Sequence, residues 1–272
     1  MRARTLDEAL AALDADSKVL AGGQSLVPML NMRLVRPARL VDINAVPGLA
    51  DIRARDDGGL ALGALTRHTA LVTSRLVHEH APLLAAAARH VGHRAIRNRG
   101  TLGGSLAHAD PAAELPAALL ALDARVVVAG PSGPRQIALD DFVLGALTTA
   151  LAADEIVTEI DVPPVRRAGW GFAEVARRAG DFALTGVAAV LHGNRGRCTA
   201  ARLVAFGADE RPVRLSAAED ALIGGARAEE SAAVAALDCR PPADVHASAE
   251  YRRHLVSVLT ARVIGEALAR LA

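Results

Sequence analysis

The chain has 272 residues, a length typical of about two domains, and a hydrophobic content of 51% is enough to fill their cores. Its 31 basic and 30 acidic residues leave a net charge of +1, which gives no reason to expect a nucleic acid or an anionic membrane as partner. It shows no signal-peptide pattern and no apolar run near the roughly 20 residues of a membrane span, so the cytoplasm is its expected location.

The N-terminal part predicts short elements separated by glycine-rich turns. Thr5, followed three positions later by Glu8, has the spacing of a capping box and predicts a helix over residues 5–15. A second, short helix is expected directly after Ser25. Alternating or β-branched segments predict strands over residues 18–20, 40–43, 51–55 and 60–65. The strong turn between the last two indicates either a hairpin or a subdomain boundary.

The middle of the chain predicts two helices and two strands. The alanine- and leucine-rich residues 82–92 favour a helix that opens at Pro82. Asp110-Pro111 has the pattern of an N-cap followed by proline at the first helical position, so a helix is expected from there to about Asp123. Strands are expected over residues 125–129 and 156–162.

The character of the chain changes near residue 166, where a polar, glycine-containing segment predicts a domain boundary. Beyond it the expected strands are residues 172–178, 183–191 and 198–206, and the expected helices are residues 216–223 and 247–271. Strands and helices are mixed without strict βαβ alternation, so the predicted class is α+β.

Two Gly-Gly pairs about eighty residues apart are the most informative motifs. They lie in Ala21-Gly22-Gly23-Gln24-Ser25 and in Thr101-Leu102-Gly103-Gly104-Ser105. Glycine allows positive φ, and consecutive backbone N–H groups in such a turn form an anion-binding nest. Two nests would hold the two halves of one pyrophosphate, which indicates a dinucleotide; an ordinary turn is the alternative. Neither segment has the Rossmann or P-loop pattern.

Few side chains suggest chemistry of their own. Asp110 is interpreted as a helix cap, and Glu114 either favours a helix dipole or points toward a hydroxyl of a cofactor. His90, His93 and His108 lack a carboxylate or cysteine at metal-ligand spacing. The two cysteines, Cys198 and Cys239, are too few for zinc or iron–sulfur sites and are expected to be buried thiols. We therefore expect no catalytic acid–base pair and no metal in this chain.

Three aromatic residues, Trp170, Phe172 and Phe182, lie close together in a chain that is only 2% aromatic. They are expected to form either a small core under the second domain or an aromatic wall beside a flat cofactor ring.

Together these motifs resemble the FAD-binding, medium subunit of the molybdenum hydroxylases, the family of xanthine dehydrogenase and aerobic carbon monoxide dehydrogenase. The resemblance runs over nearly the whole chain. It is carried by Ala21–Pro28, by Ile96–Ser105 and by Ala109-Asp110-Pro111-Ala112-Ala113-Glu114-Leu115-Pro116. Gly63–Thr66, Asp154–Val157 and Arg178–Ala183 support it.

The resemblance implies a fold and a set of cofactor contacts. Residues 1–165 would form a two-part FAD-binding domain of the vanillyl-alcohol-oxidase (PCMH) type, with subdomains of about 1–55 and 56–165, and residues 166–272 a smaller α+β domain. Non-covalent FAD would contact Val19, Leu20, Ala21, Gly22, Gly23, Gln24, Ser25, Thr101, Gly103, Gly104, Ser105, Asp110, Glu114, Val157 and Phe182. Phe182 would lie near the isoalloxazine ring. Many relatives carry a lysine within the strand at 172–175, where this chain has Glu174 and no lysine.

The resemblance also implies a function and partners. A small subunit with [2Fe–2S] clusters and a large molybdopterin subunit, arranged as a dimer of heterotrimers, would surround this chain, and FAD would pass electrons to an external acceptor. The alternatives are a stand-alone flavin oxidase of the same fold and a scaffold subunit without flavin. Scarce aromatic residues argue against the first, and the intact glycine motifs argue against the second.

Overall fold

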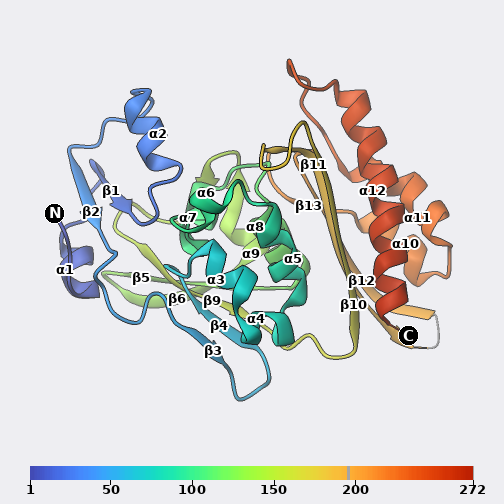
Figure 1. Cartoon of the computed structure of the whole chain (residues 1–272), viewed down its shortest axis with the longest axis horizontal. Coiled ribbons are helices and arrows are strands. Elements are labelled where there is room, and N and C mark those ends of the chain that lie inside the picture. The colour runs from blue at the N-terminus through green and yellow to red at the C-terminus, as the bar shows by residue number, and fades with distance from the viewer. Residues whose placement is uncertain (195–196, 272) are drawn as a thin grey trace.

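The computed structural model describes residues 1–194 and 197–271, which fold into three consecutive parts (Figure 1). The first part contains α1 (Leu6–Ala11), β1 (Ser17–Leu20), α2 (Leu26–Asn31) and β2 (Arg39–Asp42), with β1 and β2 parallel. Thr5 caps α1 as expected, since its hydroxyl accepts from the Glu8 N–H at 3.1 Å. The predicted helix over 5–15 is too long, because Asp14 and Ser17 exchange backbone and side-chain hydrogen bonds that form a turn instead.

The second part is built on a five-stranded antiparallel sheet of order β3-β4-β9-β5-β6. Its strands are β3 (Ile52–Ala54), β4 (Leu60–Gly63), β5 (Arg125–Gly130), β6 (Gly133–Ala138) and β9 (Ile156–Val162), and β7 (Val143–Gly145) pairs separately with β8 (Thr148–Thr149). The helices are α3 (His68–Thr73), α4 (Arg75–His80), α5 (Pro82–His90), α6 (Arg94–Arg97), α7 (Leu102–His108), α8 (Glu114–Ala121) and α9 (Leu139–Phe142). The predicted hairpin formed by β3 and β4 is confirmed.

The helix expected to be capped by Asp110 begins three residues later than predicted. The carboxylate of Asp110 accepts the N–H of Ala112 at 2.8 Å, and Ala113 is the N-cap of α8. The predicted cap was therefore wrong: Asp110 and Pro111 form a short turn in the connection from α7 to α8. As a result Glu114 is the first residue of a buried helix rather than a residue one turn inside it.

The third part is an antiparallel sheet covered by helices on its outer face (Figure 1). It contains β10 (Ala168–Ala176), β11 (Ala183–Asn194), β12 (Arg197–Phe206) and β13 (Val213–Arg214). The covering helices are α10 (Ser216–Ile223), α11 (Ala228–Val234), a 3₁₀ turn (Ala235–Asp238) and α12 (Ala249–Arg270). Gly169 and Gly171 let α12 lie directly on β10, since a Cβ at either position would overlap the helix backbone.

The inner face of this sheet packs on α5 and α8, so the core is continuous across the two domains. Phe172, Val190 and Phe206 belong to the same buried cluster as Leu83 and Leu119. The outer face forms a second cluster with α10 and α12, and a third, smaller one fills the N-terminal part. Both faces of the sheet are thus buried, which explains why β11 is apolar almost throughout.

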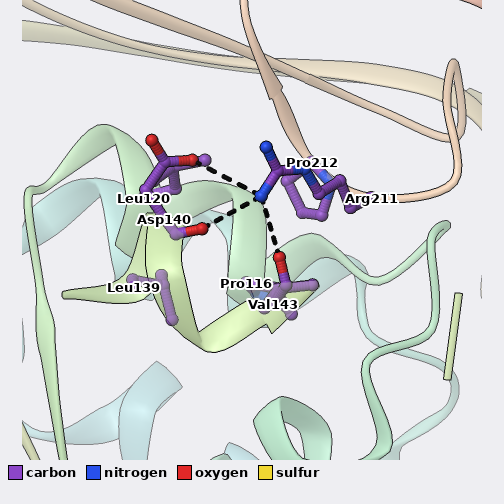
Figure 2. A pocket seen from close by; sticks show the side chains of 7 residues that line it. All are labelled: Pro116, Leu120, Leu139, Asp140, Val143, Arg211 and Pro212. Atoms are coloured by element: carbon purple, nitrogen blue, oxygen red, sulfur yellow. Dashed lines mark hydrogen bonds and ion pairs between the residues drawn. The ribbon is translucent and has the colours of Figure 1, made fainter. Parts of the chain in front are cut away.

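Polar contacts join the domains around this core. Arg211, after β12, places one guanidinium nitrogen 3.0 Å from the carbonyl oxygens of both Asp140 and Val143, as Figure 2 shows. The N–H of Gly207 donates to the carbonyl of Pro111 at 2.8 Å, and Arg202 pairs with Asp123 at 2.6 Å. The turn that precedes Glu114 is therefore held by the C-terminal domain. Among the helices of the described residues, none combines the length and apolarity of a membrane span.

Candidate functional site

The first glycine turn presents a row of free backbone donors. The N–H groups of the four residues from Gly22 to Ser25 donate to no acceptor within residues 1–194 and 197–271. The carbonyls on either side are occupied, since Asn44 Nδ2 donates to the Ala21 carbonyl at 2.8 Å and Gln24 Nε2 to that of Gly22 at 3.1 Å. Gly23 has φ +73°. Free N–H groups beside occupied carbonyls make this turn an anion-binding nest.

The second glycine pair does not form a turn of positive φ, contrary to the prediction. Gly103 and Gly104 lie in the first turn of α7, behind Thr101, which caps the helix by accepting from the Gly104 N–H at 3.2 Å. The N–H of Gly103 donates to the Ala64 carbonyl at 2.8 Å. A Cβ at Gly103 would lie 2.6 Å from that of Ala64, so this glycine allows α7 to pack closely. The backbone donors here are already used.

The two segments nevertheless lie side by side. A Cβ at Gly22 would overlap the carbonyl oxygen of Arg99 and lie 2.9 Å from the Cα of Gly100. Arg67 joins them, because its guanidinium donates to the Arg99 carbonyl and to Asn44 Oδ1, the latter at 2.7 Å. Burial and the nearby Arg99 lower the pKa of Arg67. Two adjacent guanidinium groups beside an open nest form a local environment that favours a bound anion.

The neighbouring His68 packs against the loop at Gly100 that lies beside the nest. It is 6% exposed, and burial lowers its pKa to about 4, so the ring is neutral at physiological pH. A Cβ at Gly100 would lie 2.8 Å from the ring, and the His68 N–H donates to the Gly100 carbonyl at 3.1 Å. The ring therefore fixes the loop that packs on Gly22.

Glu114 is the most perturbed carboxylate. It is 7% exposed, and burial raises its pKa to about 7. Its own backbone N–H and His90 oppose the shift, whereas Glu174 and Asp110 reinforce it. A buried carboxylate at a helix N-terminus, placed where the domains meet, is typical of a binding site and atypical of a residue that only packs.

Replacing Glu114 by glutamine is expected to stabilise the flavin-free chain in alkaline solution. Because the folded-state pKa of about 7 lies above the ordinary 4.5, the proton's stabilising contribution is fully present below pH 4.5 and is lost as the pH rises through 7. The free energy of unfolding of the variant should exceed that of the wild type by up to about 3 kcal/mol at pH 8 and by little at pH 5. Urea unfolding at both pH values measures this, and an equal gain at both would contradict it.

The remaining expected site residues occupy different surroundings. Val19 and Leu20 lie on β1 directly before the nest, and Ser105 lies in α7. Val157, on β9, is buried in the large core beneath α7. Phe182 is 70% exposed on the β10–β11 turn, whose Gly180 packs against His93.

The three aromatic residues near the domain boundary do not form one group. Phe172 is buried against His90 and Phe206, whereas Trp170 stacks with Arg270, whose guanidinium carbon lies 4.0 Å from the ring centre. Neither the common core nor the common wall expected for them is present in the described structure. The two cysteines are free and buried, as predicted.

Three residues of the site escape prediction from sequence. Asn44 and Arg67 hold the nest through contacts across more than twenty positions of the chain. Glu174 pairs with His90 at 3.0 Å, from the other domain. No local pattern encodes such long-range contacts, although Arg67 follows the supporting segment Gly63–Thr66.

Comparison with known proteins agrees with this architecture. Residues 1–165 match the FAD binding domain in molybdopterin dehydrogenase, and residues 170–267 match the CO dehydrogenase flavoprotein C-terminal domain. The chain is 44% identical to the nicotine 6-hydroxylase medium subunit of Paenarthrobacter nicotinovorans, over 96% of this chain and 93% of that protein. It is 43% identical to the 6-hydroxypseudooxynicotine dehydrogenase complex subunit alpha of the same organism, over 94% of this chain and 88% of that protein.

The structural comparison leads to the same family. The fold superimposes with a TM-score of 0.96 on a chain of carbon monoxide dehydrogenase from Hydrogenophaga pseudoflava, in a form that lacks the Mo-pyranopterin moiety of the molybdenum cofactor. That chain is 35% identical, and the match covers 100% of this chain and 97% of the other. The predicted α+β class, the two-domain architecture and the FAD-binding domain are confirmed. This chain belongs to the family of FAD-binding medium subunits of the molybdenum hydroxylases.

Proposed function

We propose that this chain carries FAD as the electron-transfer subunit of a cytoplasmic, three-subunit molybdenum hydroxylase. It would receive electrons from [2Fe–2S] clusters of a small subunit and pass them to an external acceptor. A large molybdopterin subunit would hydroxylate the substrate. The observation that carries the proposal is the open nest of Gly22 to Ser25, set against the Arg99–Gly100 backbone and flanked by two guanidinium groups.

The residues present fit a bound dinucleotide. The nest supplies four free N–H groups for one end of a pyrophosphate, and Arg67 and Arg99 offset its charge. Thr101 and Ser105 add hydroxyl groups near α7, and Glu114 supplies a buried carboxylate that accepts hydrogen bonds from hydroxyl groups. FAD accepts electrons singly and releases them in pairs, which is the chemistry that the cofactor supplies.

The residues of this chain then have binding and positioning tasks. The nest and the hydroxyl groups of Thr101 and Ser105 would hold the pyrophosphate. Val157 lies in the buried core, and Phe182 lies exposed at the rim of the other domain. Because the turn before α8 is held by the C-terminal domain through Pro111, that domain would help to fix the position of Glu114. We further propose that two heterotrimers associate into a dimer.

The purified chain is expected to be yellow, because non-covalent FAD should copurify with it. A visible spectrum, followed by acid release and mass identification of the chromophore, measures this. Released FAD would support the proposal. A colourless chain that takes up no added FAD, even when coexpressed with its small and large subunits, would support a scaffold without flavin. Turnover of an organic substrate by the chain alone would support the stand-alone oxidase.

A further inference from the structure

Three titratable side chains meet where the two domains join. His90 ends α5, Glu114 begins α8, and Glu174 lies on β10. The Nδ1 atom of His90 lies 3.0 Å from a carboxylate oxygen of Glu174. The imidazole also packs on Phe172, with ring centres 5.1 Å apart, and Phe172 stacks on Phe206. The ion pair thus crosses the domain interface and its ring is fixed by the core.

The cluster contains two buried carboxyl groups and one histidine, so its acidic groups outnumber its basic ones. The side chain of Glu174 is 7% exposed, and its second carboxylate oxygen has no hydrogen-bond partner in the described chain. Glu114 is buried as well. An apolar replacement of such buried groups is often neutral or stabilising, so burial alone gives no reason to keep them. A buried carboxylate without a complete set of partners indicates a role in binding.

His90 is the single group of this cluster that is able to carry a positive charge. Its hydrogen bond to Glu174 raises its pKa, burial opposes this, and the charges of Glu174 and Glu114 add to the increase. Asp110 is the third group, beside Glu174 and His90, whose charge acts on Glu114. When His90 is protonated, its positive charge offsets the negative charge of Glu174 beside Glu114.

We propose that His90 is a positioning residue for FAD: held by Glu174, its positive charge offsets that carboxylate, so that Glu114 is able to ionise and to accept hydrogen bonds from hydroxyl groups of the cofactor. This inference rests on the proposed function. The positive charge beside Glu174 on β10 comes from His90 on α5, in the other domain. FAD affinity should therefore increase with pH through a midpoint set by this cluster.

The test is the pH dependence of FAD affinity, measured on the full chain by the quenching of flavin fluorescence. In His90→Gln the amide still donates to Glu174, but the cation is gone. Glu114 then faces an unbalanced carboxylate, and the midpoint should move up by roughly one pH unit. In Glu174→Gln the imidazolium is unbalanced, and the midpoint should move down.

The double variant separates this inference from a merely structural role. With both residues changed to glutamine the pair is neutral again, and the midpoint should return toward that of the wild type. If both single variants weaken binding by the same factor at every pH, the ion pair only supports the fold and the inference is overturned. A wild-type affinity without any pH midpoint overturns it as well. If the wild type binds no FAD at any pH, the proposed function itself fails.

Discussion

Replacing Gly22 by alanine is expected to weaken FAD binding about 100-fold, a loss of roughly 2.7 kcal/mol. The added Cβ would overlap the carbonyl oxygen of Arg99 and lie 2.9 Å from the Cα of Gly100, so backbone must move on both sides. Overpacking of this kind costs about 1–3 kcal/mol. The movement would also displace the free N–H groups of Gly22 to Ser25. Fluorescence titration of the purified chain with FAD measures the change.

Two further substitutions control for loss of folding. Gly23 and Gly48 have φ values of +73° and +80°, so alanine strains both positions by about 1 kcal/mol. A Cβ at Gly48 would meet nothing within 4 Å, and this residue lies outside the nest. Gly23→Ala should therefore weaken FAD binding, whereas Gly48→Ala should lose similar stability and keep its affinity. Wild-type affinity in Gly22→Ala, or equal losses in the matched pair, would contradict the placement of the pyrophosphate.

The sequence predicts the regular elements well where local chemistry decides them. The hairpin of β3 and β4 and the helix α10 were found from turn residues and hydrophobic pattern alone. The prediction from sequence fails where side chains form hydrogen bonds with backbone groups and so replace helical hydrogen bonds. Asp110 forms its own turn and delays α8, and Asp14 with Ser17 shortens α1. The short helices α3, α4 and α6 were missed, because elements of four to six residues carry too little periodicity.

The sequence identified the glycine motifs of the site but not their backbone conformations or the residues that contact them. Both glycine pairs were identified, yet only the first forms a nest. The second lies in the first turn of α7, where its N–H groups donate to the Ala64 carbonyl and the Thr101 hydroxyl. Glycine serves close backbone approach as readily as positive φ, and sequence does not distinguish the two uses. The partners Arg67 and Glu174 come from distant segments, so only the fold shows how they meet Asn44 and His90.

Replacing Arg252 by methionine is expected to lower the free energy of unfolding by about 3 kcal/mol. The side chain is 6% exposed, and one guanidinium nitrogen donates to the carbonyls of both Leu184 and Gly207, while another donates to Asp244 at 2.7 Å. Methionine preserves much of the volume but removes the guanidinium donor from the buried Gly207 carbonyl, at about 1–3 kcal/mol, and also removes the ionic partner of Asp244. The Leu184 carbonyl keeps one donor, the Thr185 hydroxyl at 2.7 Å. Urea unfolding of the variant measures the loss.

The same substitution should also weaken FAD binding, because a series of contacts connects Arg252 to the candidate site. Its guanidinium fixes Gly207, the N–H of Gly207 donates to the carbonyl of Pro111 at 2.8 Å, and Pro111 lies in the turn that leads into Glu114. FAD affinity should therefore fall several-fold under conditions where the variant is fully folded. Arg262→Met, which breaks an exposed pair with Glu266 on the same helix, is the matched control and should change neither stability nor affinity noticeably. Unchanged affinity in a destabilised Arg252→Met chain would show that the C-terminal domain supports the fold without positioning Glu114.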